Sequence, residues 1–174
     1  PFDASNTVVR VLKTWQSLDY SGTTISTPAG LANPIPFVSG GTTITAKVWS
    51  QVAGTPVRFK AENRMNGAIS VETDAYTTQA GEWETLTFDL SQEVPGTQPL
   101  NLTNTYDLIS LFFDFGTAGG DVGDQIFYFD DVVFGDMSSQ ISEDLGASMR
   151  MYPNLLTNGQ PLQLEAMGGQ SYFF

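Results

Sequence analysis

Two adjacent carboxylates, Asp130 and Asp131, lie within the apolar segment 126–135, which reads IFYFDDVVFG. Carboxylate oxygens are ligands for hard cations, and Ca²⁺ prefers several such oxygens together with backbone carbonyls. The pair therefore predicts a calcium site that braces this segment. The alternative is that both carboxylates are solvated at the end of a strand.

A second set of side chains is suited to binding a neutral polysaccharide. Aromatic rings pack against the apolar faces of sugars, while charged and polar groups hydrogen-bond to the hydroxyls. The candidates for ligand contact are Trp15, Tyr20, Trp49, Arg58 and Glu62. In the alternative interpretation, the tryptophans cap the edge of a core, and Arg58 and Glu62 form a surface ion pair worth about 1 kcal/mol or less.

Catalysis by this chain is not expected. The sequence has no Cys and no His, which removes the commonest nucleophile–base pairs and metal ligands. A glycosidase needs two carboxylates roughly 5–10 Å apart, and Asp114 with Glu62 is the candidate pair. Because 19 residues are acidic, chance pairs of carboxylates are common. A hydrolase that uses Asp114 and Glu62 remains a lesser alternative.

The charge of the chain limits its partners. Nineteen acidic residues against seven basic ones give a formal net charge of −12. Binding to nucleic acid or to an anionic membrane surface requires clustered Lys and Arg, so neither partner is expected. No apolar run approaches the roughly 18 residues of a membrane-spanning segment, and membrane insertion is not expected either.

The segments that carry these residues alternate between apolar and polar positions, which is typical of half-buried strands. In 42–50, for example, Trp49 falls on the polar side, and Arg58 and Glu62 fall on the polar side of the next segment. We therefore expect these side chains to share one solvent-facing surface. Asn66-Gly67 predicts a hairpin turn, and Trp83 is expected to pack at the start of a strand. About seven strands are predicted, with 23–26 as an additional short segment: 7–15, 42–50, 57–63, 68–78, 84–91, 107–116 and 125–134.

This pattern, without a convincing amphipathic helix, predicts an all-β fold. We expect an antiparallel two-sheet β-sandwich of jelly-roll type in residues 1–135. A polar linker follows at 136–148. Residues 149–174 form a short β-rich appendage, too small to hold a core alone.

Four segments occur in an order that resembles a known family: GGTTITAKVWSQVAGTPVRFKAEN, TTQAGEWETLTFDLS, ISLFFDFG and IFYFDDVVF. Residues 7–135 resemble the carbohydrate-binding β-sandwich modules of secreted Bacteroidota glycan-degrading enzymes, notably laminarinases. The resemblance implies β-glucan binding, with laminarin as the favoured ligand, and a structural calcium ion held first by Asp130 and then by Asp131. Such modules generally begin with an additional strand that bears an acidic residue. Only residues 1–6 precede the first strand here, so we expect that additional strand to be missing or replaced.

The segment MYPNLLTNGQPLQLE resembles the start of the C-terminal sorting domain of the type IX secretion system. Tyr152, Pro153 and Asn154 match the usual motif, Leu155 stands where that family usually has a second proline, and Gly159 belongs to the same signal. The resemblance implies recognition by the type IX secretion machinery and a location outside the cell or on its outer surface.

Two functions from different classes therefore follow from the sequence. The first is non-catalytic polysaccharide binding, as an independent protein or as the accessory module of a larger glycoside hydrolase. The second is a surface-structural or cargo protein that the type IX machinery recognises and that binds no glycan.

Overall fold

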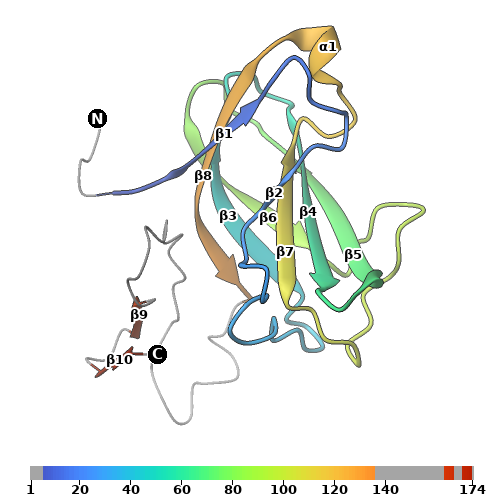
Figure 1. Cartoon of the computed structure of the whole chain (residues 1–174), viewed down its shortest axis with the longest axis vertical. Helices are drawn as coiled ribbons and strands as arrows, with labels where there is room; N and C mark the ends of the chain where they lie inside the picture. Colours follow the sequence, from blue (N-terminus) through green and yellow to red (C-terminus); the bar gives the residue numbers. More distant parts are fainter. Residues whose placement is uncertain (1–5, 136–162, 167–169, 174) are drawn as a thin grey trace.

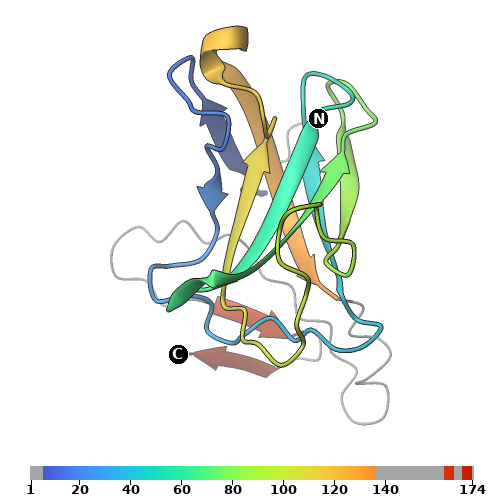
Figure 2. The same ribbon diagram turned by 90° about the vertical axis from the view of Figure 1, so that its right-hand side faces the viewer.

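The computed structural model describes residues 6–135, 163–166 and 170–173, and almost all of its regular structure is β. Figure 1 shows two layers of strands, and Figure 2 shows them turned by 90°. Each layer is a four-stranded antiparallel sheet. The predicted all-β, two-sheet sandwich is confirmed.

The first sheet, here called sheet A, contains the first and last strands of the sandwich. Its order is β1 (Val9–Lys13), β8 (Gln125–Phe134), β3 (Thr43–Trp49) and β6 (Trp83–Asp89). Sheet B has the order β2 (Thr23–Thr24), β7 (Leu108–Phe113), β4 (Pro56–Asn63) and β5 (Asn66–Tyr76). Consecutive strands thus alternate between sheets until β4 pairs with β5, which is the connectivity of a jelly roll.

The core lies between the two inner faces. In β3, Ile44, Ala46 and Val48 are fully buried, and the intervening residues face outward, as the alternation predicts. Phe59 of β4 meets Phe88 of β6 across the core, with ring centroids 5.3 Å apart. Because both sheets have one apolar and one polar face, their outer faces are the surfaces on which a ligand could lie.

One end of the sandwich is formed by loops and by α1 (Gly119–Val122), the short helix between β7 and β8. This helix packs on the β1–β2 loop, where the Gly119 amide donates to the Ser17 carbonyl at 2.8 Å. A Cβ atom at Gly119 would collide with the Thr14 carbonyl oxygen, so only glycine allows this close approach. The same end carries the β3–β4 loop (Figures 1 and 2).

The predicted hairpin between β4 and β5 is present, but its turn is not Asn66-Gly67. Asn63 pairs with Asn66, so Arg64 and Met65 form the turn and Asn66 opens β5. The Asn63 side-chain oxygen accepts the amides of Met65 and Asn66 at 2.9 and 3.1 Å. Asn63, three residues before the predicted Asn66, therefore organises the hairpin turn.

In the C-terminal region the structure describes one antiparallel pair, β9 (Gln163–Ala166) with β10 (Gln170–Phe173). This pair agrees with the β character expected for the appendage. The linker 136–148 lies outside the described residues, as do the expected sorting-signal residues Tyr152, Pro153, Asn154 and Gly159. Among the residues that are described, no helix is long and apolar enough to cross a membrane.

Candidate functional site

Three aromatic side chains form a row across the outer face of sheet A. Trp49 of β3 is in register with Trp83 of β6 on one side and with Tyr128 of β8 on the other. Arg10 of β1 is in register with Tyr128 and continues the row. Neighbouring strands lie about 4.8 Å apart, so these four residues cross the sheet at one level. We call Trp83, Trp49, Tyr128 and Arg10 the aromatic row.

The Tyr128 ring packs against both tryptophan rings of the row, and the rings do not lie in one plane. The Trp49 and Tyr128 centroids are 5.5 Å apart at an interplanar angle of 75°, and Trp83 and Tyr128 are 6.4 Å apart at 50°. Trp83 is 45% exposed, while Trp49 and Tyr128 are half-buried. The row therefore offers apolar ring surface to solvent in a corrugated rather than flat arrangement.

A row of polar residues, here called the polar level, lies on the same outer face, two residues along each strand from the aromatic row. Lys47 of β3 is in register with Thr85 of β6 and with Asp130 of β8. The Lys47 ammonium lies 2.8 Å from the Asp131 carboxylate, in an ion pair whose lysine side chain is half exposed. Apolar rings and hydrogen-bonding groups are thus one level apart, which is the combination that an amphipathic sugar chain requires.

Glu84 holds the turn that leads into Trp83. Its carboxylate accepts four hydrogen bonds of 2.8–3.0 Å, from the amide and hydroxyl of Thr78 and from the amide of Gln79. Burial by itself raises the pKa of Glu84, but these hydrogen bonds outweigh it and hold the pKa below its ordinary value. The charged carboxylate therefore fixes the β5–β6 turn beside the row.

The structure does not bring Arg58 and Glu62 together with Trp49. All three face outward, as predicted, but Trp49 is in sheet A, whereas Arg58 and Glu62 are in β4 of sheet B. The predicted common surface of these residues is therefore wrong: they lie on opposite faces of the sandwich. The reason is that the β3–β4 loop crosses from one sheet to the other.

Arg58 is engaged in an internal network on the outer face of sheet B. Its guanidinium binds both oxygens of Asp74, at 2.7 and 2.9 Å, and one oxygen of Glu72 at 3.2 Å. It also lies 3.7 Å from the centroid of the Phe115 ring. The hydrogen bond to Asp74 is the main cause that raises the pKa of Arg58. These contacts match the ion-pair alternative, with Asp74 and Glu72 as partners in place of Glu62.

Glu62 has a partner of its own, the ammonium of Lys60, at 2.6 Å. It is also far from Asp114, with which a hydrolase would need to pair it. Glu62 is in register with Leu108, whereas Asp114 lies six residues further along the chain, next to Pro56. At about 3.3 Å per residue this separation is roughly 20 Å, beyond the range of a glycosidase pair.

Trp15 and Tyr20 lie in the β1–β2 loop, away from the aromatic row. They are 61% and 60% exposed. The Trp15 amide donates to the Asp124 carboxylate at 2.7 Å, which ties this loop to the residue before β8. Both rings are free to contact a partner, but the structure does not place them beside Trp49.

Asp130 and Asp131 have different surroundings. Asp131 has a positive φ of 46° at a bulge in β8 and is paired with Lys47. Asp130 is 4% exposed; its Oδ2 accepts from the Asn6 amide at 3.0 Å, and its Oδ1 has no hydrogen-bond partner. Within the described part of the chain, no three His, Cys, Asp or Glu residues converge as a metal site.

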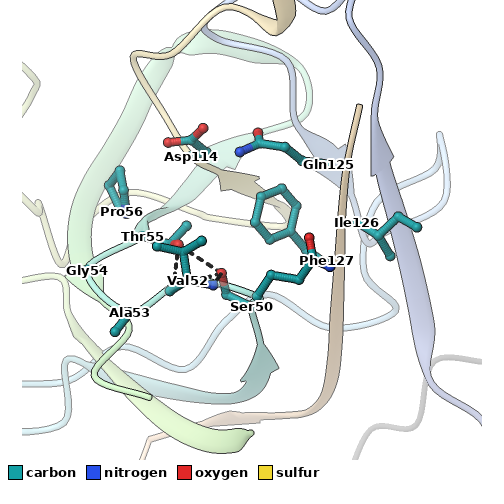
Figure 3. Close-up of a pocket in the computed structure, with 11 residues that line it drawn as sticks. Ser50, Val52, Ala53, Gly54, Thr55, Pro56, Asp114, Gln125, Ile126 and Phe127 are labelled. Carbon is teal, nitrogen blue, oxygen red and sulfur yellow. Dashed lines mark hydrogen bonds between the residues drawn. The ribbon is translucent and has the colours of Figure 1, made fainter. Parts of the chain in front are cut away.

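A pocket of about 190 Å³ lies at the α1 end of the sandwich (Figure 3). Gln125 and Asp114 point toward one another above the ring of Phe127, and the β3–β4 loop forms the facing wall. In this wall the hydroxyls of Ser50 and Thr55 lie 3.0 and 2.7 Å from the Val52 carbonyl oxygen. The loop is therefore held in shape by its own side chains.

Sequence reasoning missed three members of the aromatic row. Trp83 was expected only to pack, yet its indole is 45% exposed, because it opens an edge strand. Tyr128 lies between the buried Phe127 and Phe129, so alternation alone could have identified it as outward-facing. Arg10 could be recognised only from the register of β1 with β8.

Comparisons with known proteins leave the family of the chain open. No protein-family model matches the sequence, and a search among curated proteins finds no match.

Proposed function

We propose that the protein binds a neutral polysaccharide, without catalysis, on the outer face of sheet A. The observation that carries the proposal is the register of Trp83, Trp49 and Tyr128 on three adjacent strands. The Tyr128 ring lies 5.5 Å from the Trp49 ring and 6.4 Å from the Trp83 ring, so the three rings together offer apolar surface to the faces of a sugar chain. The polar level beside them supplies donors and acceptors for hydroxyl groups.

The tilts of the rings support one kind of polysaccharide over another. A crystalline surface requires coplanar rings, whereas these rings are inclined by 75° and 50°. A single twisted chain presents its sugar faces at changing angles and fits inclined rings better. A soluble β-glucan such as laminarin, which the sequence resemblance implies, is a chain of this kind and is the first probe.

The charge distribution also supports a neutral ligand. The chain carries a net charge of −12, so an anionic polysaccharide would be repelled at long range. Among the residues that the structure describes, Arg10 and Lys47 are the basic groups on the binding face, and Lys47 is already paired with Asp131. Hydroxyl groups therefore suit this surface better than carboxylates or sulfates.

The proposed site of action is outside the cell or on its outer surface, after export by type IX secretion. This part of the proposal rests on the motif Tyr152-Pro153-Asn154. A fusion of residues 149–174 to a reporter protein tests it: the reporter should reach the medium of a type IX-competent host and remain inside a secretion-deficient mutant.

Affinity electrophoresis tests the binding proposal. The wild-type protein should be retarded in gels that contain laminarin or another soluble β-glucan, and Trp49→Ala should lose most of the retardation. Trp15→Ala is the matched control, because Trp15 is exposed but lies outside the aromatic row. Equal mobility of all three proteins across a panel of neutral glucans, mannans and xylans would exclude the proposed function.

We further propose a calcium ion at Asp130. The buried Oδ1 of Asp130, which lacks a hydrogen-bond partner, supports this, because a buried carboxylate oxygen is costly to leave unpaired. The Asn6 side-chain amide beside it carries an oxygen of the kind that Ca²⁺ accepts as a ligand. The ion would brace β8 against the residues that precede β1.

A further inference from the structure

The pair Asn66-Gly67, which the sequence predicts as a hairpin turn, lies instead at the start of β5, directly after the turn. Of residues 66–70, only Asn66 and Ser70 are in register with β4, so Gly67 has no residue of β4 opposite it. Residues 66–68 are all exposed. The peptide bond between Asn66 and Gly67 therefore lies where the ladder of the sheet is interrupted, and water reaches it.

An asparagine that precedes a glycine can react with its own backbone. The glycine nitrogen loses its proton and attacks the side-chain carbonyl carbon of the asparagine, and the side-chain nitrogen leaves as ammonia. Water then opens the resulting five-membered imide at either of its two carbonyls, which gives aspartate or isoaspartate. The sum of the steps converts an amide and one water into a carboxylate and ammonium, with no change of oxidation state.

The side chain of Asn66 is folded toward the attacking atom. Its Oδ1 accepts a hydrogen bond from the Ala68 amide at 3.2 Å. This bond closes a ring that contains the Gly67 nitrogen, so the side-chain carbonyl is held over the Gly67 peptide group. The same donor stabilises the negative charge that develops on Oδ1 when the nitrogen attacks. The hairpin therefore favours the reaction through position and through charge.

The space around Gly67 is open. The nearest atom to a Cβ built on this glycine is Oε2 of Glu62, at 3.9 Å. Glycine has no side chain to hinder closure of the imide ring. Gly67 is also absent from the glycines with positive φ, so an alanine at this position is compatible with the backbone. Gly67→Ala is therefore a variant that should fold.

Two other asparagines share this hydrogen-bonding pattern but not the glycine. Oδ1 of Asn63 accepts the Met65 amide at 2.9 Å, and Oδ1 of Asn101 accepts the Thr103 amide at 3.0 Å. The residues that follow these asparagines are an arginine and a leucine. Their side chains hinder attack by the backbone nitrogen, so Asn63 and Asn101 are controls within the same molecule.

We propose that Asn66 is a site of spontaneous deamidation in the folded protein, where water and the Gly67 amide convert it to aspartate or isoaspartate. Either product places a new negative charge close to the Glu62 carboxylate. Isoaspartate also lengthens the main chain by one carbon where β5 leaves the turn. Because β5 belongs to sheet B, this site is separate from the aromatic row of sheet A.

Peptide mapping by mass spectrometry tests the proposal on the full chain during incubation in mildly alkaline buffer. Trypsin cleaves after Arg64 and so places Asn63 and Asn66 on different peptides. It also separates Asn66 from the pair Asn158-Gly159, which lies outside the described residues. The Asn66 peptide should acquire the mass of the acid and contain isoaspartate, while Asn63 and Asn101 stay intact. Gly67→Ala should slow the conversion about tenfold or more.

A synthetic peptide of residues 61–70 gives the rate for an unfolded chain. In the folded protein, Asn66 should react at a rate within about tenfold of the peptide. A slower rate in the folded protein would overturn the proposal, because the hairpin would then protect the site. Conversion of Asn63 and Asn101 as fast as that of Asn66, or a rate that Gly67→Ala leaves unchanged, would overturn it as well. The comparison of the three asparagines needs only the wild-type chain.

Discussion

The ammonium nitrogen of Lys13 lies 2.7 Å from the backbone carbonyl oxygen of Asp114 and 3.2 Å from that of Phe113. Lys13 ends β1 in sheet A; the two carbonyls belong to Phe113, which ends β7 in sheet B, and to Asp114, which follows it. The lysine is 3% exposed, so a buried charge joins the two sheets beside the pocket. Burial lowers the pKa of Lys13, and the charges of Asp114 and Asp19 oppose this effect.

Lys13→Met is expected to lower the free energy of unfolding by about 1–3 kcal/mol, because two buried carbonyls lose a charged donor while the apolar volume is retained. Urea unfolding measures the change. Lys47→Met is the matched control, since Lys47, whose side chain is 52% exposed, forms a surface pair with Asp131 that should contribute about 1 kcal/mol or less. Similar losses in both variants would show that the link between the sheets is unimportant.

Trp83→Ala should weaken binding of a soluble β-glucan about tenfold or more, because an aromatic contact at the end of the row is lost. Trp83 opens an edge strand, so the fold should be kept. Titration calorimetry with laminarin measures the effect. The same truncation at Trp15, another exposed tryptophan, should change the affinity by less than about twofold. A larger effect would show that the glycan binds at the β1–β2 loop, which carries Trp15.

Arg58→Met should destabilise the sandwich but leave glycan binding unchanged. The bidentate pair with Asp74 has side chains only 12% and 20% exposed, so its loss should cost about 1–3 kcal/mol, between surface and buried ion pairs. Thermal unfolding and calorimetry on the same sample measure both properties. Reduced affinity for the glycan with an unaltered unfolding temperature would show that Arg58 contacts the ligand.

Calcium should raise the midpoint of thermal unfolding, and chelation by EDTA should lower it. Asp130→Asn should remove this response, because the amide oxygen is a weaker ligand than the carboxylate. Asp131→Asn is the control, since Asp131 is paired with Lys47 and should contribute little to the ion. A calcium response that Asp130→Asn leaves intact would place the ion elsewhere.

Acidification should destabilise the protein through Glu84. Its pKa is held below the ordinary value of 4.5 in the folded chain, so its charged form stabilises the fold above that pH and the contribution is lost as the pH falls through the lowered pKa. Glu84→Gln should therefore be less stable than wild type at pH 7, with a difference that narrows below about pH 4. Urea unfolding at several pH values tests this; a difference that does not vary with pH would contradict it.

Local patterns in the sequence predict the fold well because each strand shows its own alternation. Ile44, Ala46 and Val48 are buried while Trp49 faces outward, as the two-residue period requires. The register of distant strands leaves no such local pattern. Trp49 and Tyr128 are neighbours across β3 and β8, yet no feature of either segment specifies that they meet.

The same limit explains the error at Arg58. Trp49 and Arg58 are close in sequence and both occupy outward positions, so a shared surface was a natural expectation. In a jelly roll, however, the chain crosses to the other sheet between β3 and β4, and short sequence separation then places side chains on opposite faces. Alternation predicts which face of its own sheet a side chain occupies. Which of the two sheets the strand joins follows only from the topology.

The antiparallel pairing of β1 with β8 has a mechanical consequence. Val9, at the start of β1, is in register with Phe129, and the Asn6 side chain reaches Asp130, so the polypeptide enters and leaves the sandwich at the same end. The bonds between these strands lie perpendicular to the chain direction. A force that pulls on both ends of the sandwich therefore breaks the hydrogen bonds between β1 and β8 one after another, instead of loading all of them at once. Under tension, the sandwich should yield first at β1.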